Sequence, residues 1–308
     1  MKTRGKRGAV ITVGTFDGVH RGHQEILRRV DEIARAEGLE RVAYTFVFPP
    51  RFVLVGSESG LLLPEEVKVK LLERRVDRVI RVDFHEVGAV KAERFAREVL
   101  IERLTTRTVV VGDRFRFGRD REGDVDLLRR IGEEEGVSIV SLPPLVVDQV
   151  AVSSTRIRSL LRQGMIDDAT TLLGRPPLLF GKVVYGDRIG REIGYRTANL
   201  ALDPRLLRPA SGVYVVHAFF RGEGGAGMMY IGDRPTVGGD EMRCEVHLFS
   251  PPLGELYGEH MEVHLLHRLR GDRCFSSLSD LRLQIDRDAE RARALLPSYN
   301  GPQRPILA

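Results

Sequence analysis

The apolar pattern of the chain changes character once, close to Leu173-Gly174-Arg175-Pro176-Pro177. Before this point strand-like and helix-like segments alternate, which predicts a mostly parallel sheet with helices on both faces. After it, helical spacing nearly vanishes until about residue 277, and short β-rich segments separated by glycines predict a closed antiparallel barrel. The chain has 308 residues, enough for two domains with separate cores. We therefore expect one domain at 1–173 and a second at 174–308.

Periodicity places the individual elements. In the first domain we expect strands at 9–13, 41–46, 79–84, 108–112 and 137–142, and helices at 26–34, 64–72, 95–104, 125–131 and 157–162. In the second domain we expect strands at 178–185, 212–221, 228–231, 243–249 and 260–267. A helix at 278–296 has apolar residues at helical spacing, so it is expected to pack across the barrel and to expose its acids and bases to solvent.

The first strand runs directly into the turn Gly14-Thr15-Phe16-Asp17-Gly18-Val19-His20-Arg21-Gly22-His23, and a helix follows. His20 and His23 are expected at or just before its first turn, where backbone N–H groups lack intrahelical partners and the helix dipole is positive. Glycines at 14, 18 and 22 allow positive φ and a close approach of the backbone to a ligand. The pattern predicts a site for nucleotide phosphates.

Ligands of parallel α/β sheets bind at the carboxyl ends of the strands, and two further segments are expected at that edge. The segment Gly112–Gly118 leaves the strand that ends at Val111. The segment Ser153-Ser154-Thr155-Arg156-Ile157-Arg158 caps a helix and offers hydroxyls and free N–H groups beside two arginines. Taken alone, this second segment is more simply explained as a plain helix cap.

Two segments of the second domain carry chemistry. The glycine-rich segment 181–200 predicts a loop over phosphates, and Thr197 and Asn199 offer two oxygen ligands on one face if the chain there is extended. In Arg243-Cys244-Glu245-Val246-His247-Leu248 the alternation puts Glu245 and His247 on one face. A carboxylate there can take a proton from a substrate hydroxyl.

Composition excludes several classes. With 42% hydrophobic and 30% charged residues, without an 18-residue apolar run and without a signal-peptide pattern, the chain is expected to be cytoplasmic. Cys244 and Cys274 lack the spacing of a zinc site and are expected to be reduced thiols. The net charge is +5, and the basic residues are interspersed with 43 acidic ones. Phosphorylated small-molecule partners explain this mildly basic balance as well as nucleic-acid binding does. Nothing in the sequence resembles a DNA-recognition helix or an aromatic-rich RNA-binding surface, which argues against nucleic acid as a partner.

The motifs, in their order along the chain, closely resemble those of the prokaryotic bifunctional riboflavin kinase/FAD synthetase family. The resemblance covers nearly the whole chain and rests on the Gly14–His23 turn, Ser153–Arg158, Leu172–Arg175, Gly190–Leu200, Gly212–Tyr214, Ile231–Thr236, Glu245 with Leu256–Gly258, and Phe275–Leu278. It implies a Rossmann-like nucleotidylyltransferase (FMN adenylyltransferase) domain followed by a β-barrel riboflavin kinase domain with a terminal helix. The implied substrates and products are riboflavin, FMN, FAD and ATP, with Mg²⁺ as cofactor.

The resemblance also implies roles for single residues. His20 and His23 would donate to the α-phosphate of ATP, Glu245 would be the base of the kinase step, and Thr197 and Asn199 would hold Mg²⁺. The implied ATP-binding residues of the adenylyltransferase are Gly14, Phe16, Asp17, Gly18, Gly22, Ser153, Ser154, Thr155 and Arg158. Those implied for ATP and flavin in the kinase are Gly181, Gly186, Gly190, Arg191, Gly194, Thr197, Asn199, Arg270 and Phe275.

The chain departs from the family pattern at three points. Arg196 stands where the kinase loop usually has proline, and Arg114 stands before Phe115 where an acidic or amide residue is common. The segment Thr45–Pro50 lacks the histidine of the usual T-F-x-P-H-P. Because of these departures, an enzyme that keeps only one of the two activities stays open as an alternative. A regulator that binds flavin or nucleic acid through the basic surface is a second alternative, and it ranks far lower.

Overall fold

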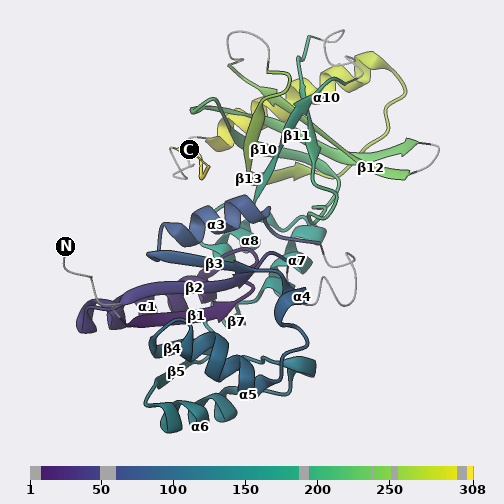
Figure 1. The fold of residues 1–308 in the computed structure, drawn as a ribbon. Coiled ribbons are helices and arrows are strands. Elements are labelled where there is room, and N and C mark those ends of the chain that lie inside the picture. The colour runs from purple at the N-terminus through teal and green to yellow at the C-terminus, as the bar shows by residue number, and fades with distance from the viewer. Residues whose placement is uncertain are drawn as a thin grey trace. The chain divides into compact units, whose positions relative to one another are not determined.

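The computed structural model describes residues 8–48, 60–186, 194–236, 239–250, 256–296 and 304–307, with backbone only at 233–236 and 239–242. These residues form two compact units, 1–59 with 65–154 and 60–64 with 155–308. Figure 1 shows the strands of the sheet in the first unit and those of the barrel in the second. Within the described helices, none is long and apolar enough to cross a membrane.

The first unit contains a parallel sheet of five strands in the order β3-β2-β1-β4-β5. Its strands are β1 Ala9–Gly14, β2 Glu40–Phe46, β3 Arg78–Val82, β4 Thr106–Gly112 and β5 Ser138–Leu142, with a small hairpin of β6 Val146–Val147 and β7 Val150–Ala151. The parallel sheet is confirmed. Because the strand order reverses between β1 and β4, the carboxyl ends of these two strands form the switch point at which such sheets bind ligands.

Helices cover both faces of this sheet, because successive side chains of a strand point to opposite faces and apolar residues occur on both. Ile11 and Val13 of β1 pack on one side with Leu100 and Leu128, whereas Val10 packs on the other side with Val30. The helical elements are α1 Arg21–Glu37, α3 Glu65–Glu73, α4 Phe84–Val87, α5 Ala92–Arg94, the π-helix η2 Phe95–Glu102, the 3₁₀ turn η3 Arg119–Arg121 and α6 Val125–Glu135. The strand expected to reach residue 84 ends at Val82, because the side chain of Asp83 caps α4.

The second unit is a closed barrel in the order β10-β11-β12-β9-β8-β13, and every neighbouring pair is antiparallel. Its strands are β8 Leu178–Val184, β9 Ala198–Leu202, β10 Gly212–Phe220, β11 Glu223–Thr236, β12 Gly239–Leu248 and β13 His260–Arg270. The terminal helix α10 Leu278–Leu295 buries Ala289 and Ala292 against Val213 and Met228. The predicted barrel and its covering helix are confirmed.

Residues 155–173 group with the barrel rather than with the sheet. They form α7 Ser154–Gln163 and α8 Ile166–Leu173, of which α8 was not expected. Ala210 N–H donates to Leu161 O at 3.0 Å, and His267 pairs with Asp167 at 2.7 Å. These contacts explain why the compact units divide between Ser154 and Thr155, whereas the periodicity changes at 173.

A buried carboxylate holds the segment 304–307 on the barrel. Glu262 of β13 is 2% exposed, accepts Ile306 N–H at 2.9 Å, and lies 2.6 Å from His264 Nε2. Each of these groups would lose its partner if the carboxylate were removed.

Glu262→Ala is therefore expected to destabilise the protein by roughly 1–3 kcal/mol for each buried donor left unpaired. Urea unfolding of the full chain measures this effect. Glu259→Ala is the matched control, because the exposed Glu259–Arg221 ion pair at 2.9 Å contributes only about 0–1 kcal/mol. Equal unfolding midpoints for the two variants would contradict the role given to Glu262.

Candidate functional site

The turn between β1 and α1 has a strained backbone. Phe16 has φ 49° and Val19 has φ 40°, values that are unfavourable for a bulky or β-branched residue. Val19 N–H donates to Phe16 O at 3.0 Å, and Phe16 is 1% exposed, so packing and a tight turn hold the strain. Of the three expected glycines only Gly18 has positive φ (85°). Gly14 and Gly22 instead serve close packing, since an added Cβ would lie 3.3 Å from the Phe16 and His20 rings, respectively. Such strain is typical of functional sites.

His20 and His23 form a stacked pair at the start of α1. Their ring centroids lie 3.6 Å apart, and Phe16 packs edge-on to His23 at 5.2 Å. His20 is the N-cap, and its Nδ1 accepts the backbone N–H of His23 at 3.3 Å. Because Nδ1 is the acceptor, the proton of a neutral His20 ring is on Nε2.

Burial, and then the neighbouring His20, hold the pKa of His23 well below its usual value of 6.5. Both causes disfavour the imidazolium, so His23 is neutral at pH 7. Its Nδ1 is buried without a hydrogen-bond partner in the described part of the chain. The pair thus places a neutral His23 and the N-cap His20 beside the N-terminus of α1, where an anion is favoured.

Ser154, the last residue of the first unit, contacts this turn through one hydrogen bond. Ser154 Oγ donates to the carbonyl oxygen of Asp17 at 2.9 Å, and Asp17 is itself 4% exposed. Ser153 lies in the same unit, whereas Thr155 and Arg158 belong to the barrel unit, in which Arg158 Nε donates to Gly60 O at 2.8 Å. The segment that begins at Gly112 leaves β4 at the switch point, and Arg114 within it is exposed.

In the barrel, Glu245 of β12 pairs with Asn199 of β9. Cys244, Val246 and Leu248 are buried, while Glu245 and His247 are partly exposed, as the alternation predicts. Burial raises the pKa of the Cys244 thiol to about 12, and both cysteines are free thiols. A carboxylate and an amide oxygen that are 46 positions apart in the sequence therefore lie side by side on neighbouring strands.

Arg243 lies beside the Glu245 carboxylate. Its guanidinium is 2.5 Å from Glu245 Oε1, and the Glu245 side chain is 15% exposed. Within the described residues Glu245 Oε2 forms no hydrogen bond. One oxygen of the carboxylate is thus positioned by an arginine, and the other is able to accept a proton.

Contacts of Tyr195 and Arg196 hold the segment before Thr197. The Arg196 carbonyl oxygen accepts from His247 Nδ1 at 2.9 Å, Tyr195 packs edge-on to His247, and the Tyr195 hydroxyl donates to Asp286 of α10. The contact made at position 196 uses the carbonyl oxygen, which proline would also supply. The departure at Arg196 therefore leaves this anchoring contact intact.

Arg270 and Phe275 lie together near α10. The Arg270 guanidinium carbon is 5.8 Å from the Phe275 ring centroid, and Arg270 Nε donates to Asp288 at 2.8 Å. Asp288 is 5% exposed, so the expectation that all charged residues of this helix face solvent was wrong for Asp288. Asp288 is buried because it forms an ion pair with Arg270, and the spacing of residues along the helix does not reveal such a partner.

The expected glycines of the kinase segment have different environments. Gly194 has φ 88°, and an added Cβ at Gly181 would lie 2.5 Å from Ala201 O. At Gly186 it would lie 2.1 Å from Asn199 Nδ2. Gly190 and Arg191 lie outside the described residues.

Gly186→Ala is expected to displace the Asn199 amide and to lower any activity that uses it by about ten- to a hundred-fold, because misplacements of about 1 Å have such effects. Gly225→Ala, in β11 of the same barrel, is the control, since its added Cβ meets only Leu248 at 3.7 Å. Steady-state phosphorylation of riboflavin compares the two variants. A rate for Gly186→Ala equal to that of the control would show that Asn199 is not needed at its present position.

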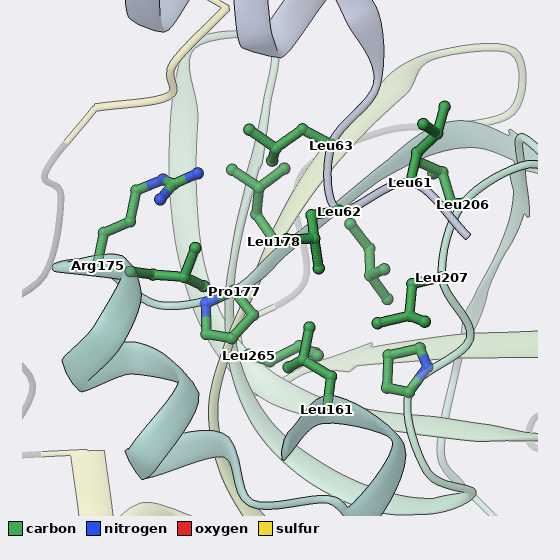
Figure 2. A pocket seen from close by; sticks show the side chains of 13 residues that line it. Leu61, Leu62, Leu63, Leu161, Arg175, Pro177, Leu178, Leu206, Leu207 and Leu265 are labelled. Atoms are coloured by element: carbon green, nitrogen blue, oxygen red, sulfur yellow. The ribbon is translucent and has the colours of Figure 1, made fainter. Parts of the chain in front are cut away.

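The barrel unit also contains a small apolar cavity of about 20 Å³, lined mainly by leucines and prolines from its own segments (Figure 2). Arg175 is the charged residue among those that line it, and none of the expected site residues does so. A cavity of this size has room for about one water molecule. It is therefore too small for a nucleotide or a flavin.

Comparison with known proteins gives a consistent picture. Residues 2–156 match the family model for FAD synthetase, and residues 173–296 match that for riboflavin kinase. A bifunctional riboflavin kinase/FMN adenylyltransferase of Escherichia coli K12 is 38% identical, with 94% of this chain and 93% of that protein covered. One of Pseudomonas fluorescens is 37% identical over the same shares.

A solved structure titled macrolide-efflux protein, from Streptococcus pneumoniae, is also similar to this chain. It has a TM-score of 0.85 and 32% identity, and the match covers 93% of this chain and 94% of that one. Its title names a different activity, whereas both family models and the curated relatives name flavin enzymes.

Proposed function

Since the chain belongs to the family of bifunctional riboflavin kinase/FMN adenylyltransferases, we propose that it catalyses two ATP-dependent reactions, from riboflavin to FMN and from FMN to FAD. The observation that carries the proposal is that each matched segment has a separate set of suitable groups. The first has a stacked pair of histidines at a helix N-terminus, and the second has a carboxylate beside an amide oxygen.

In the kinase reaction, the ribityl 5′-hydroxyl oxygen attacks the γ-phosphorus of ATP and ADP leaves. Glu245 accepts the hydroxyl proton, and Arg243 keeps the carboxylate in place. Phosphoryl transfer needs little covalent help from the protein, so positioning and charge neutralisation dominate. Arg270 and Phe275 would contribute a cation and an aromatic surface for the substrates.

The oxygen atoms of Thr197 and Asn199 fit Mg²⁺, which prefers hard oxygen ligands and is usually held by one or two protein groups together with substrate phosphates. Asn199 is kept in place by the close approach of Gly186 and by its pairing with Glu245. When bound, the cation would neutralise charge on the ATP phosphates.

In the adenylyl transfer, a phosphate oxygen of FMN attacks the α-phosphorus of ATP and pyrophosphate leaves. His20 and His23 donate hydrogen bonds to the α-phosphate oxygens as negative charge builds up there. The free N–H groups at the start of α1, beside Gly18, would bind the remaining phosphate oxygens, and Ser154 would hold the turn through Asp17.

Incubation of the purified protein with riboflavin, ATP and Mg²⁺, followed by chromatographic separation of the flavins, tests both steps. We expect FMN first and FAD later. Accumulation of FMN alone would contradict the adenylyltransferase assignment. Formation of FAD from added FMN but not from riboflavin would contradict the kinase assignment.

The same groups favour small phosphorylated molecules over nucleic acid as partners. A nucleic-acid partner would give binding with a steep salt dependence set by the number of phosphate contacts. We expect weak binding of duplex DNA and of RNA at physiological salt.

A further inference from the structure

Lys68 is a buried lysine that the two reactions as described do not use. It lies on α3 and is 4% exposed, and its ammonium donates to the carbonyl oxygen of Phe46 at the end of β2. Within the described residues no carboxylate forms an ion pair with it. Burying an ammonium with one carbonyl partner is costly, so its position requires a reason.

The ammonium lies at the carboxyl edge of the sheet, beside the strained turn. β2 is paired with β1 up to Thr45 and Gly14, and Phe46 is the next residue of β2. Thr45 Oγ1 donates to Thr15 O at 3.4 Å, which ties the end of β2 to the turn. A group bound at Phe46 O is therefore adjacent to the segment that carries the histidine pair.

Three charged groups act on Lys68 from the elements around it. Glu65 is on α3 itself, Asp17 is in the turn, and Arg81 is on β3. Burial, the largest effect, lowers the pKa of Lys68, while the charges of Glu65 and Asp17 oppose this and Arg81 adds to it. Glu65 is already paired with Arg81 at 3.5 Å. Of the two acids, Glu65 has the larger effect on Lys68, and the buried Asp17 of the turn has the smaller one.

We propose that Lys68 is a positioning residue of the adenylyl-transfer site. Its positively charged ammonium binds the carbonyl oxygen of Phe46 at the end of β2, which Thr45 ties to the turn, and so keeps the turn in the conformation that aims His20 and His23 at the α-phosphate. Only the protonated form supplies this charge. This inference rests on the proposed function of the turn.

The test compares Lys68→Met with Lys70→Met, which removes a half-buried ammonium from the same helix. In Lys68→Met we expect kcat for FAD formation from FMN and ATP to fall by about ten- to a hundred-fold. Lys70→Met is expected to retain the wild-type rate. FMN formation from riboflavin by the same samples is expected to stay unchanged, which shows that the barrel unit is folded. A wild-type rate of FAD formation in Lys68→Met would overturn the proposal.

A pH profile separates positioning from a merely structural role. The protonated form dominates below the pKa of Lys68, so the rate of FAD formation is expected to fall as pH rises through that pKa, which lies below the ordinary 10.5. Lys70→Met is expected to keep this alkaline decline and Lys68→Met to lose it. Lys68→Met with reduced activity and an unchanged alkaline decline would overturn the proposal.

Lys68→Arg keeps the test decisive if Lys68→Met does not fold. Arginine stays charged throughout this pH range, so activity at neutral pH is expected within about tenfold of wild type, without the alkaline decline. Persistence of the decline in Lys68→Arg would assign it to another group and overturn the proposal. Absence of FAD formation by the wild-type protein would instead contradict the proposed function.

Discussion

Glu245→Gln is expected to lower the rate of FMN formation from riboflavin by a factor of about 10²–10⁴, the usual contribution of a general base. Glutamine preserves the shape of the side chain and can still accept a hydrogen bond from Arg243, but it cannot take up the hydroxyl proton. The change therefore removes the chemistry with little change in packing. Steady-state rates with riboflavin, ATP and Mg²⁺ measure the effect.

Two controls accompany this measurement. FAD formation from supplied FMN is expected to be unchanged in Glu245→Gln, because Glu245 lies outside the adenylyltransferase segment. Glu259→Gln alters an exposed glutamate of the same barrel unit and is expected to leave both activities unchanged. FMN formation by Glu245→Gln within threefold of wild type would show that Glu245 is not the base.

His23→Ala is expected to lower FAD formation by about a hundred- to a thousand-fold, the usual effect of removing one donor to a developing negative charge. His20 is expected to stay in place as the N-cap, since its Nδ1 accepts from the backbone N–H at position 23, which alanine keeps. FMN formation is expected to continue, so a reaction that starts from riboflavin accumulates FMN. Chromatography of the flavins measures both products.

The matched control is His85→Ala, which removes an exposed imidazole from the same unit. Its side chain is not part of the cap of α4, because Asp83 accepts from the backbone N–H of His85. We expect wild-type FAD formation in this variant. A similar loss in both variants would point to a general effect on the unit, and an unaffected His23→Ala would overturn the role of His23.

Local patterns predict elements whose periodicity is long and regular. α1 was predicted because five apolar residues recur at helical spacing on one face, and β4 because its β-branched run is continuous. The short helix α8 was missed, although Ile166, Ala169 and Leu172 are buried and three apart. Eight residues form only about two helical turns, which is a short repeat for detecting helical spacing. Gly174, which ends this helix, was interpreted as part of the boundary between the two domains.

The residues of the candidate sites were likewise predicted only in part. Sequence motifs identified His20, His23, Asn199 and Glu245 as residues with suitable chemistry, and the structure supplies the contacts around them. No motif indicated Lys68. A lysine on a short helix is usually exposed, and its burial follows from how α3 packs at the end of β2.

The amino-acid sequence by itself determined the order of the elements, the change from a parallel sheet to a barrel, and the residue types at each strand end. These properties depend on periodicity and on turn residues, which act over a few positions. Tertiary structure alone decided that Glu245 pairs with Asn199, that the two histidines stack, and that the ammonium of Lys68 is buried beside the turn. Those contacts depend on which strands and helices become neighbours, and this is set by packing between segments far apart in the chain.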